Sequence, residues 1–125
     1  MSTFRRIHRD DIHAHLQAGT PMLLVEALPE KYYRAGHLPG AIQVNHDEIR
    51  ARADTHLPEK DAFIVVYCSN SACQNSRMAA QTLASLGYNN VAEHDEGKQD
   101  WMEAGLPSEK HQHAARSQTY GRPQE

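Results

Sequence analysis

The fold is decided by the stretch Ala62-Phe63-Ile64-Val65-Val66-Tyr67-Cys68, which is followed by a polar segment at residues 69–76 and a helical pattern at residues 77–86. A continuous apolar, β-branched run of this length predicts a strand buried on both faces of a parallel sheet. The run stops at a thiol, and the small polar residues after it are typical of a loop that leads into a helix. We therefore expect Cys68 to lie at the carboxyl end of a central strand.

This position favours a nucleophilic role for Cys68. Backbone N–H groups at the start of a helix, together with the helix dipole, stabilise negative charge, so they favour a thiolate and an anionic substrate alike. We expect Cys68 to be the catalytic residue rather than a buried cysteine that packs as a small hydrophobic side chain. The loop after it is expected to bind the substrate through its N–H groups. Its residues are Ser69, Asn70, Ser71, Ala72, Cys73, Gln74 and Asn75.

A second thiol, Cys73, follows Cys68 after four intervening residues. The chain shows no export signal, and this favours two reactive thiols over a structural disulfide. Cys73 fits either of two roles. It is a resolving thiol that attacks Cys68 when that residue is oxidised or persulfidated, or it is a small side chain that fills the underside of the loop.

Three residues outside the loop are expected to support it. Glu26 ends an apolar strand and is expected to orient the loop or the nearby glycine-proline turn at residues 36–41. His37 lies in that turn, where a ring nitrogen is expected to bond a backbone carbonyl, with a general base as the minor alternative. Arg77 lies on the first turn of the following helix and is expected to be a solvated charge more than an anion clamp.

Strand and helix patterns alternate along the chain, which predicts an α/β fold with a mainly parallel sheet. The expected strands cover residues 4–7, 22–27, 42–44, 62–68 and 88–92. The expected helices cover residues 10–17, 29–34, 47–53, 77–86 and 98–104. In the fourth helix, Met78, Leu83 and Leu86, together with Ala79 and Ala80, are expected to face the sheet. The chain of 125 residues is expected to be one domain at residues 1–107, followed by a polar extension at residues 108–125 that cannot bury enough apolar surface to fold alone.

Composition excludes several classes of function. The formal net charge is −3 and no basic block is present, so nucleic acid is not an expected partner. The chain has no apolar run long enough to cross a membrane and no signal-like amino terminus, so we expect a cytoplasmic protein without a membrane partner. Nine histidines include two His-x-His pairs, but neither pair has other ligands at suitable spacing, so we expect no metal site and no cofactor.

Four blocks in the sequence resemble the single-domain rhodanese-like proteins of the sulfurtransferase superfamily. They lie at residues 36–41 (Gly-His-Leu-Pro-Gly-Ala), 65–68 (Val-Val-Tyr-Cys), 79–88 and 101–107, and the resemblance covers nearly the whole chain apart from the polar extension. It implies a five-stranded, mainly parallel sheet flanked by helices on both faces. It also implies a thiosulfate-type sulfurtransferase, in which Cys68 takes sulfane sulfur from a small sulfur-containing anion such as thiosulfate, or from a protein persulfide, and passes it to a thiol or cyanide. The oligomeric state stays open, and a homodimer is compatible with the sequence.

The chain departs from the common pattern of the family in its active loop. Ala79 lies about two positions further from Cys68 than is usual, and residues 69–76 contain neither glycine nor arginine. The frequent Gly-Gly before the last helix is reduced to Glu96-Gly97, and Glu26 is followed by alanine and leucine where arginine is common.

Two other functions are alternatives to sulfur transfer. The first is a dithiol redox sensor or partner-binding module in which Cys68 and Cys73 cycle between dithiol and disulfide. The second is a cysteine phosphatase or arsenate reductase, which needs a guanidinium that binds the tetrahedral oxyanion. Gln74 stands where that arginine is expected, so this chemistry is disfavoured.

Overall fold

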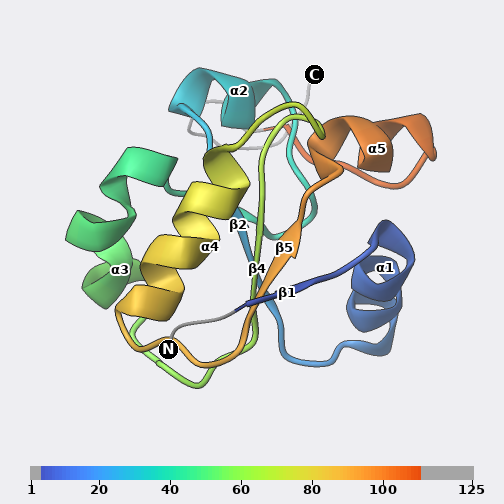
Figure 1. Ribbon diagram of the computed structural model, residues 1–125. Coiled ribbons are helices and arrows are strands. Elements are labelled where there is room, and N and C mark those ends of the chain that lie inside the picture. The colour runs from blue at the N-terminus through green and yellow to red at the C-terminus, as the bar shows by residue number, and fades with distance from the viewer. Residues whose placement is uncertain (1–3, 111–125) are drawn as a thin grey trace, which may run out of the picture.

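A computed structural model describes residues 4–110 of the chain, which form one five-stranded α/β sheet flanked by helices (Figure 1). The sheet has the strand order β1-β5-β4-β2-β3, and all four strand pairs are parallel, as the sequence predicts. The elements are β1 (Arg5–Arg6), α1 (Arg9–Ala18), β2 (Leu23–Glu26), α2 (Glu30–Ala35), β3 (Ile42–Gln43), η1 (His46–Glu48), α3 (Ile49–His56), β4 (Ile64–Tyr67), α4 (Asn75–Ser85), β5 (Val91–His94) and α5 (Gly97–Glu103).

The central strand β4 is fully buried, and its side chains alternate between two apolar cores. Ile64 and Val66 lie in the core beneath α3 and α4, whereas Val65 and Tyr67 lie in the core shared with α1 and α5. Figure 1 shows α3 and α4 on one side of the sheet and α1 on the other. A strand buried on both faces needs the unbroken apolar run that the sequence shows.

The fourth helix begins earlier and faces the sheet differently from the prediction. It starts at Asn75 instead of Arg77, so Ser76 belongs to its first turn. Its buried residues lie at positions 76, 79, 80, 83 and 84, the spacing of one helical face. Met78 falls outside that stripe and is 41% exposed, so the expectation that it faces the sheet is wrong.

The last strand is also displaced from its predicted position at residues 88–92. β5 runs from Val91 to His94 and is buried throughout, because the polar side chains of Glu93 and His94 find polar partners inside the fold. Tyr88 precedes the strand and fills the core near α3, where its hydroxyl donates to the carbonyls of Ala53 and Leu57. Likewise, the helix predicted at residues 47–53 is η1 followed by α3.

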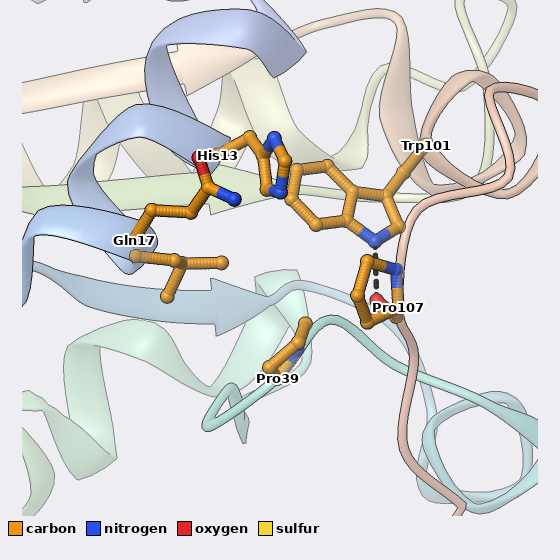
Figure 2. A pocket seen from close by; sticks show the side chains of 6 residues that line it. His13, Gln17, Pro39, Trp101 and Pro107 are labelled. Atoms are coloured by element: carbon orange, nitrogen blue, oxygen red, sulfur yellow. Dashed lines mark hydrogen bonds between the residues drawn. The ribbon is translucent and has the colours of Figure 1, made fainter.

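Trp101 anchors α5 to the fold. Its side chain is fully buried, and its indole N–H donates to the carbonyl of Pro107 at 2.7 Å. Figure 2 shows His13 of α1 beside the indole, with the two rings almost perpendicular at 84° and their centroids 6.1 Å apart. A surface cavity of about 310 Å³ lies beside these rings and is also lined by Leu16, Gln17 and Pro39. Because α5 begins beside the active loop, Trp101 also anchors the helix that contacts this loop.

The first residues of the predicted polar extension pack on the domain. His37 and Glu109 form an isolated antiparallel bridge with backbone hydrogen bonds of 2.8 Å in both directions. The remainder of the extension, residues 111–125, lies outside the described residues. Within residues 4–110, no helix is long and apolar enough to cross a membrane.

Replacing Trp101 by alanine is expected to lower the free energy of unfolding by about 3–5 kcal/mol, because it empties a large buried site and leaves the Pro107 carbonyl without its donor. Met78→Ala, a large-to-small change on an exposed part of α4, is the matched control and is expected to cost less than about 1 kcal/mol. Urea unfolding of both variants measures the difference. Equal losses would show that the indole does not stabilise α5 as described.

Candidate active site

Cys68 directly follows β4 and is completely buried beneath the first turn of α4. Its thiol is 3.5 Å from the carbonyl oxygen of Cys73 and 3.5 Å from the hydroxyl oxygen of Ser76, and both are placed to accept from it. The sulfur therefore lies between the end of the loop and the start of the helix, where the sequence predicts the nucleophile.

Ser76 links the thiol to a buried carboxylate that sequence analysis missed. Its hydroxyl donates to Glu93 of β5 at 2.8 Å, and both side chains are buried. In this chain of contacts, the proton of the Cys68 thiol can pass to the Ser76 oxygen while the Ser76 proton passes to Glu93. Glu93 is paired in register with Val66, two residues before Cys68, which fixes the carboxylate below the site.

The two thiols have opposite acidities. Burial, reinforced by the side chain of Cys73, raises the pKa of Cys68 to about 11 despite hydrogen bonds with Ser76 that lower it. Burial thus opposes the stabilisation of a Cys68 thiolate that is expected from the start of the helix, although Ser76 in the first turn of α4 acts in the expected direction. Burial also acts to raise the pKa of Cys73, but hydrogen bonds from the Cys68 thiol and from the N–H groups of Asn75 and Ser69 outweigh it and lower that pKa.

The loop between Cys68 and α4 is a pair of tight turns. The Asn70 side chain accepts from the N–H of Ala72 at 3.0 Å, and the Asn70 carbonyl accepts from the N–H of Cys73 at the same distance. These turns expose Ser71, Ala72 and Gln74, while Ser69, Asn70 and Cys73 are half-buried. Asn75, predicted as the last loop residue, is the first residue of α4 and is half-buried.

The amino terminus of α5 holds the start of this loop. The N–H groups of Lys98 and Gln99 donate to the carbonyls of Cys68 and Ser69, both at 2.8 Å. Gly97 makes this approach possible, because a Cβ at that position would lie 2.8 Å from backbone atoms of Cys68, Ser69 and Asn70. Its φ of +76° also favours glycine. Sequence analysis noted Gly97 only as part of a reduced Gly-Gly pair.

A buried charge network joins this end of the sheet. Glu26 at the end of β2 is fully buried, accepts from Lys98 at 3.0 Å and accepts from the Tyr67 hydroxyl at 2.8 Å. Lys98 also donates to the carbonyls of Tyr32 and Gly36. The Tyr67 oxygen in turn accepts from the N–H of Leu38 at 3.1 Å. Glu26 thus lies between the glycine-proline turn and the helix that holds the loop.

The side chains of His37 and Arg77 make none of the hydrogen bonds described above for the two cysteines. The Nδ1 atom of His37 is 2.9 Å from the carbonyl of Tyr33, and the two rings stack at a centroid distance of 3.8 Å. A bond between a ring nitrogen and a backbone carbonyl is the structural role that the sequence predicts for His37. Arg77 is exposed on α4, and its side chain makes no ion pair or hydrogen bond with any other residue in the range 4–110.

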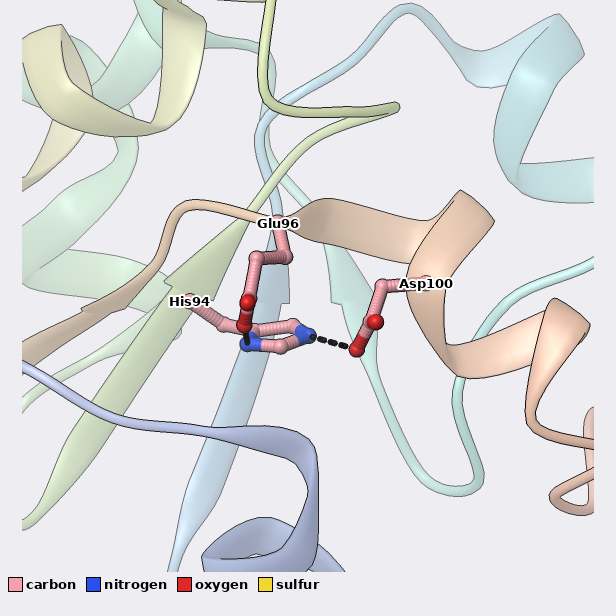
Figure 3. A group of neighbouring side chains, drawn as sticks. All are labelled: His94, Glu96 and Asp100. Carbon is pink, nitrogen blue, oxygen red and sulfur yellow. Dashed lines mark ion pairs between the residues drawn. The ribbon is translucent and has the colours of Figure 1, made fainter.

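A group suited in composition to a metal lies at the end of β5: His94, Glu96 and Asp100 (Figure 3). Nδ1 of His94 lies 3.9 Å from Glu96, whereas Nε2 lies 3.7 Å from Asp100, so the two carboxylates face opposite ring nitrogens. Nδ1 is also within 3.1 Å of the Ile7 carbonyl, and Arg9 already pairs with Asp100. We interpret this group as a contact between β5, α1 and α5.

The Gly97→Ala variant tests how the loop is held. Gly105 has the same φ of +76° but has no atom within 4 Å of the Cβ it would carry, so Gly105→Ala is a matched control for backbone strain alone. Both variants are expected to lose about 1–2 kcal/mol of stability from the positive φ, and Gly97→Ala is expected to lose about 1–3 kcal/mol more. Urea unfolding measures both losses. Equal losses would show that the close packing of Gly97 is unimportant.

The order of thiol acidities predicts a pH profile. Alkylation of Cys73 is expected at lower pH than alkylation of Cys68, and Cys68→Ala is expected to shift the Cys73 profile to higher pH, because it removes one of the hydrogen bonds that stabilise the Cys73 thiolate. Iodoacetamide labelling between about pH 6 and pH 10, read out by peptide mass, measures both profiles. Earlier labelling of Cys68 would contradict the assignment.

Comparison with known proteins gives the family. A family model for the rhodanese-like domain matches residues 8–104. The chain is 33% identical to the HTH-type transcriptional regulator Rv0324 of Mycobacterium tuberculosis over 101 residues, which cover 81% of this chain and 43% of the regulator. It is 34% identical to the thiosulfate sulfurtransferase PspE of Escherichia coli over 64 residues, which cover 51% of this chain and 59% of that protein. The chain thus spans less than two thirds of the length of either relative.

Solved structures share the fold. The crystal structure of a thiosulfate sulfurtransferase from Pseudomonas aeruginosa superposes with a TM-score of 0.77 at 24% identity, over 94% of this chain and 22% of that one. The crystal structure of the BH2092 protein from Bacillus halodurans superposes with a TM-score of 0.78, also at 24% identity, over 85% of this chain and 77% of that one. The match of the family model across most of the chain agrees with these superpositions, and the chain belongs to the rhodanese-like domain family.

Proposed function

We propose that the protein is a sulfurtransferase that carries sulfane sulfur as a persulfide on Cys68, taking it from a donor such as thiosulfate and passing it to a thiol or to cyanide. One observation carries this proposal: the Cys68 sulfur lies at the carboxyl end of the central strand, 3.5 Å from the hydroxyl oxygen of Ser76, which in turn donates to the buried carboxylate of Glu93. The backbone N–H of Ser76 lowers the pKa of Cys68, and an N–H so placed stabilises the charge of a persulfide. Relatives named as sulfurtransferases in the same family support it.

The contacts of Cys68 fit both halves of such a cycle. Once the thiol proton has passed through Ser76 toward Glu93, the sulfur can attack a sulfane sulfur and displace the remainder of the donor, which is sulfite when the donor is thiosulfate. An acceptor thiolate or cyanide then attacks the outer sulfur, and Cys68 leaves as a thiolate that regains its proton. No cofactor enters either step.

The charge beside the loop bears on the choice of donor. A cavity of about 230 Å³ is lined by Asn70 and Ser71 of the loop and by Glu96, Asp100 and Glu103, together with Gln99. Of these three carboxylates, Asp100 is the one that pairs with Arg9. Carboxylates on this side disfavour a small anion and favour a protein persulfide carried on a positively charged surface, which agrees with the second donor class expected from the sequence.

A dithiol redox module is the second candidate, because both cysteines are free and the Cys68 thiol lies 3.5 Å from the carbonyl oxygen of Cys73. A phosphatase or arsenate reductase is disfavoured. Gln74 is an exposed amide and supplies no guanidinium to bind a tetrahedral oxyanion.

Incubation with thiosulfate and cyanide tests the sulfurtransferase. We expect thiocyanate to form, and the mass of Cys68 to increase by one sulfur atom when cyanide is omitted. The Cys68→Ser variant is expected to lose both signals, whereas Ser85→Ala, on the exposed end of α4, is expected to keep them.

Two results would overturn the proposal. The first is that the wild-type protein acquires no sulfur on Cys68 from either thiosulfate or a protein persulfide. The second is that the Cys68→Ser variant forms as much thiocyanate as the wild-type protein. Reversible loss of two thiols together in mild peroxide, without sulfur transfer from either donor, would favour the redox module instead.

A further inference from the structure

The ammonium group of Lys98 has a hydrogen-bond acceptor for each of its three protons. It donates to a carboxylate oxygen of Glu26 at 3.0 Å, to the carbonyl of Tyr32 at 2.8 Å and to the carbonyl of Gly36 at 2.6 Å. The Lys98 side chain is only 14% exposed. An ammonium enclosed in this way has no proton left to donate to a sulfur donor, so Lys98 is not a ligand for the substrate.

The backbone of the same residue contacts the nucleophile. The N–H of Lys98 donates to the carbonyl of Cys68 at 2.8 Å. Because Gly97 carries no side chain, the start of α5 can lie directly against the end of β4. Lys98 therefore connects the reactive cysteine, through its N–H, to the buried carboxylate of Glu26, through its ammonium.

Glu26 contacts the chain on the other side of the nucleophile. Its second carboxylate oxygen accepts at 2.8 Å from the hydroxyl of Tyr67, the residue directly before Cys68. Glu26 and Tyr67 are partners in the register of β2 and β4, so this bond joins neighbouring strands. Burial, followed by the charge of Glu26, raises the pKa of Tyr67 well above its ordinary value, so the hydroxyl keeps its proton and remains the donor.

We propose that Glu26 and Lys98 are positioning residues for Cys68, and that their ion pair holds the backbone on both sides of the nucleophile so that its sulfur stays aligned with Ser76. This inference rests on the proposed function, since it concerns the rate at which Cys68 takes up sulfur. Both residues act through the Tyr67 hydroxyl and the Cys68 carbonyl, without contact with the donor.

The Cys68 sulfur needs this support because its own contacts are weak. The thiol lies 3.5 Å from the carbonyl oxygen of Cys73 and 3.5 Å from the hydroxyl oxygen of Ser76, and a thiol is a weak hydrogen-bond donor. Attack on a sulfane sulfur requires close and aligned reacting atoms, and a misplacement of about 1 Å can cost roughly 100-fold in rate. The bonds of 2.8 Å to Tyr67 and to the Cys68 carbonyl are better suited to fix the position.

An ion pair is an effective anchor here because both of its charges are enclosed. Glu26 has no exposed surface, so removing the Lys98 ammonium leaves a buried carboxylate without its counter-ion. Such a carboxylate gains water or moves. A movement of Glu26 is passed to Tyr67 through one hydrogen bond, and a movement of Lys98 is passed to Cys68 through another.

The first test measures how fast Cys68 of the full chain gains one sulfur at increasing thiosulfate concentration, with the product identified by peptide mass. Lys98→Met keeps the backbone N–H and the approximate length of the side chain but removes the ammonium. We expect its loading rate at saturating thiosulfate to fall about tenfold or more, because the nucleophile is misplaced. The thiosulfate concentration that gives half of this rate is expected to change little, because Lys98 does not contact the donor.

Two further variants complete this test. Leu57→Ala opens a cavity in the core beneath α3 and α4, so it is a control that lowers stability away from the site and is expected to keep the saturating rate. Tyr67→Phe removes only the hydroxyl bond and leaves both charges of the ion pair in place. It is expected to lower the saturating rate as Lys98→Met does, and it decides the question if Lys98→Met does not fold. Circular dichroism checks the folding of each variant.

Hydrogen exchange tests the attachment without any sulfur chemistry. In Lys98→Met, the amides at positions 98 and 99 are expected to exchange at least about tenfold faster relative to the β4 amides of Val65 and Val66, because the start of α5 opens locally. In Leu57→Ala, this ratio is expected to stay as in the wild-type protein, because that change weakens the fold as a whole.

The outcomes separate this inference from the proposed function. If folded Lys98→Met or Tyr67→Phe loads sulfur at the wild-type saturating rate, the positioning role is wrong while the sulfurtransferase proposal stands. An unchanged exchange ratio in Lys98→Met, or a loss confined to the affinity for thiosulfate, would also overturn it. If the wild-type protein acquires no sulfur from thiosulfate or from a protein persulfide, the proposed function fails, and the exchange ratio still decides whether the ion pair holds the nucleophile.

Discussion

The structure depends on the way the carboxyl end of β4 is fastened to the start of α5. Two backbone hydrogen bonds, from Lys98 and Gln99, hold the carbonyls of Cys68 and Ser69, and the absence of a side chain at Gly97 lets the two segments meet. The Lys98 side chain extends the same attachment to the buried carboxylate of Glu26. Removing one partner from a buried pair leaves the other charge uncompensated, at a cost of about 3–5 kcal/mol, so these elements are expected to keep one arrangement.

This attachment determines how polar groups divide between the two cysteines. With the first loop residue held by α5, the following turns leave Cys73 half-buried, while Cys68 stays fully buried beneath α4 with Ser76. Hydrogen bonds within the loop lower the pKa of Cys73, and burial raises the pKa of Cys68. One short loop thus gives its two sulfurs different depths and different acidities.

Sequence reasoning predicted the fold and the position of Cys68 because both depend on local apolar pattern and on blocks that are contiguous in the chain. It missed Ser76 and Glu93, which are 17 residues apart and meet only when α4 packs on β5. Glu93 lay beyond the predicted end of its strand, because an acidic residue gives no sign of burial until its partner is known. Lys98 looked like an ordinary helix residue for the same reason. The pKa values of the two thiols likewise depend on how deeply each side chain is buried and on the direction of the nearby backbone N–H groups. The spacing of the cysteines along the sequence reveals neither.

A crystal structure of the protein after exposure to thiosulfate tests the central claim most directly, namely that this site stores sulfane sulfur on its buried cysteine. The account predicts electron density for one additional sulfur bonded to Cys68, beneath the first turn of α4 and in contact with Ser76. Density for a Cys68–Cys73 disulfide, or an unmodified Cys68 in crystals whose protein has demonstrably reacted with thiosulfate, would contradict it.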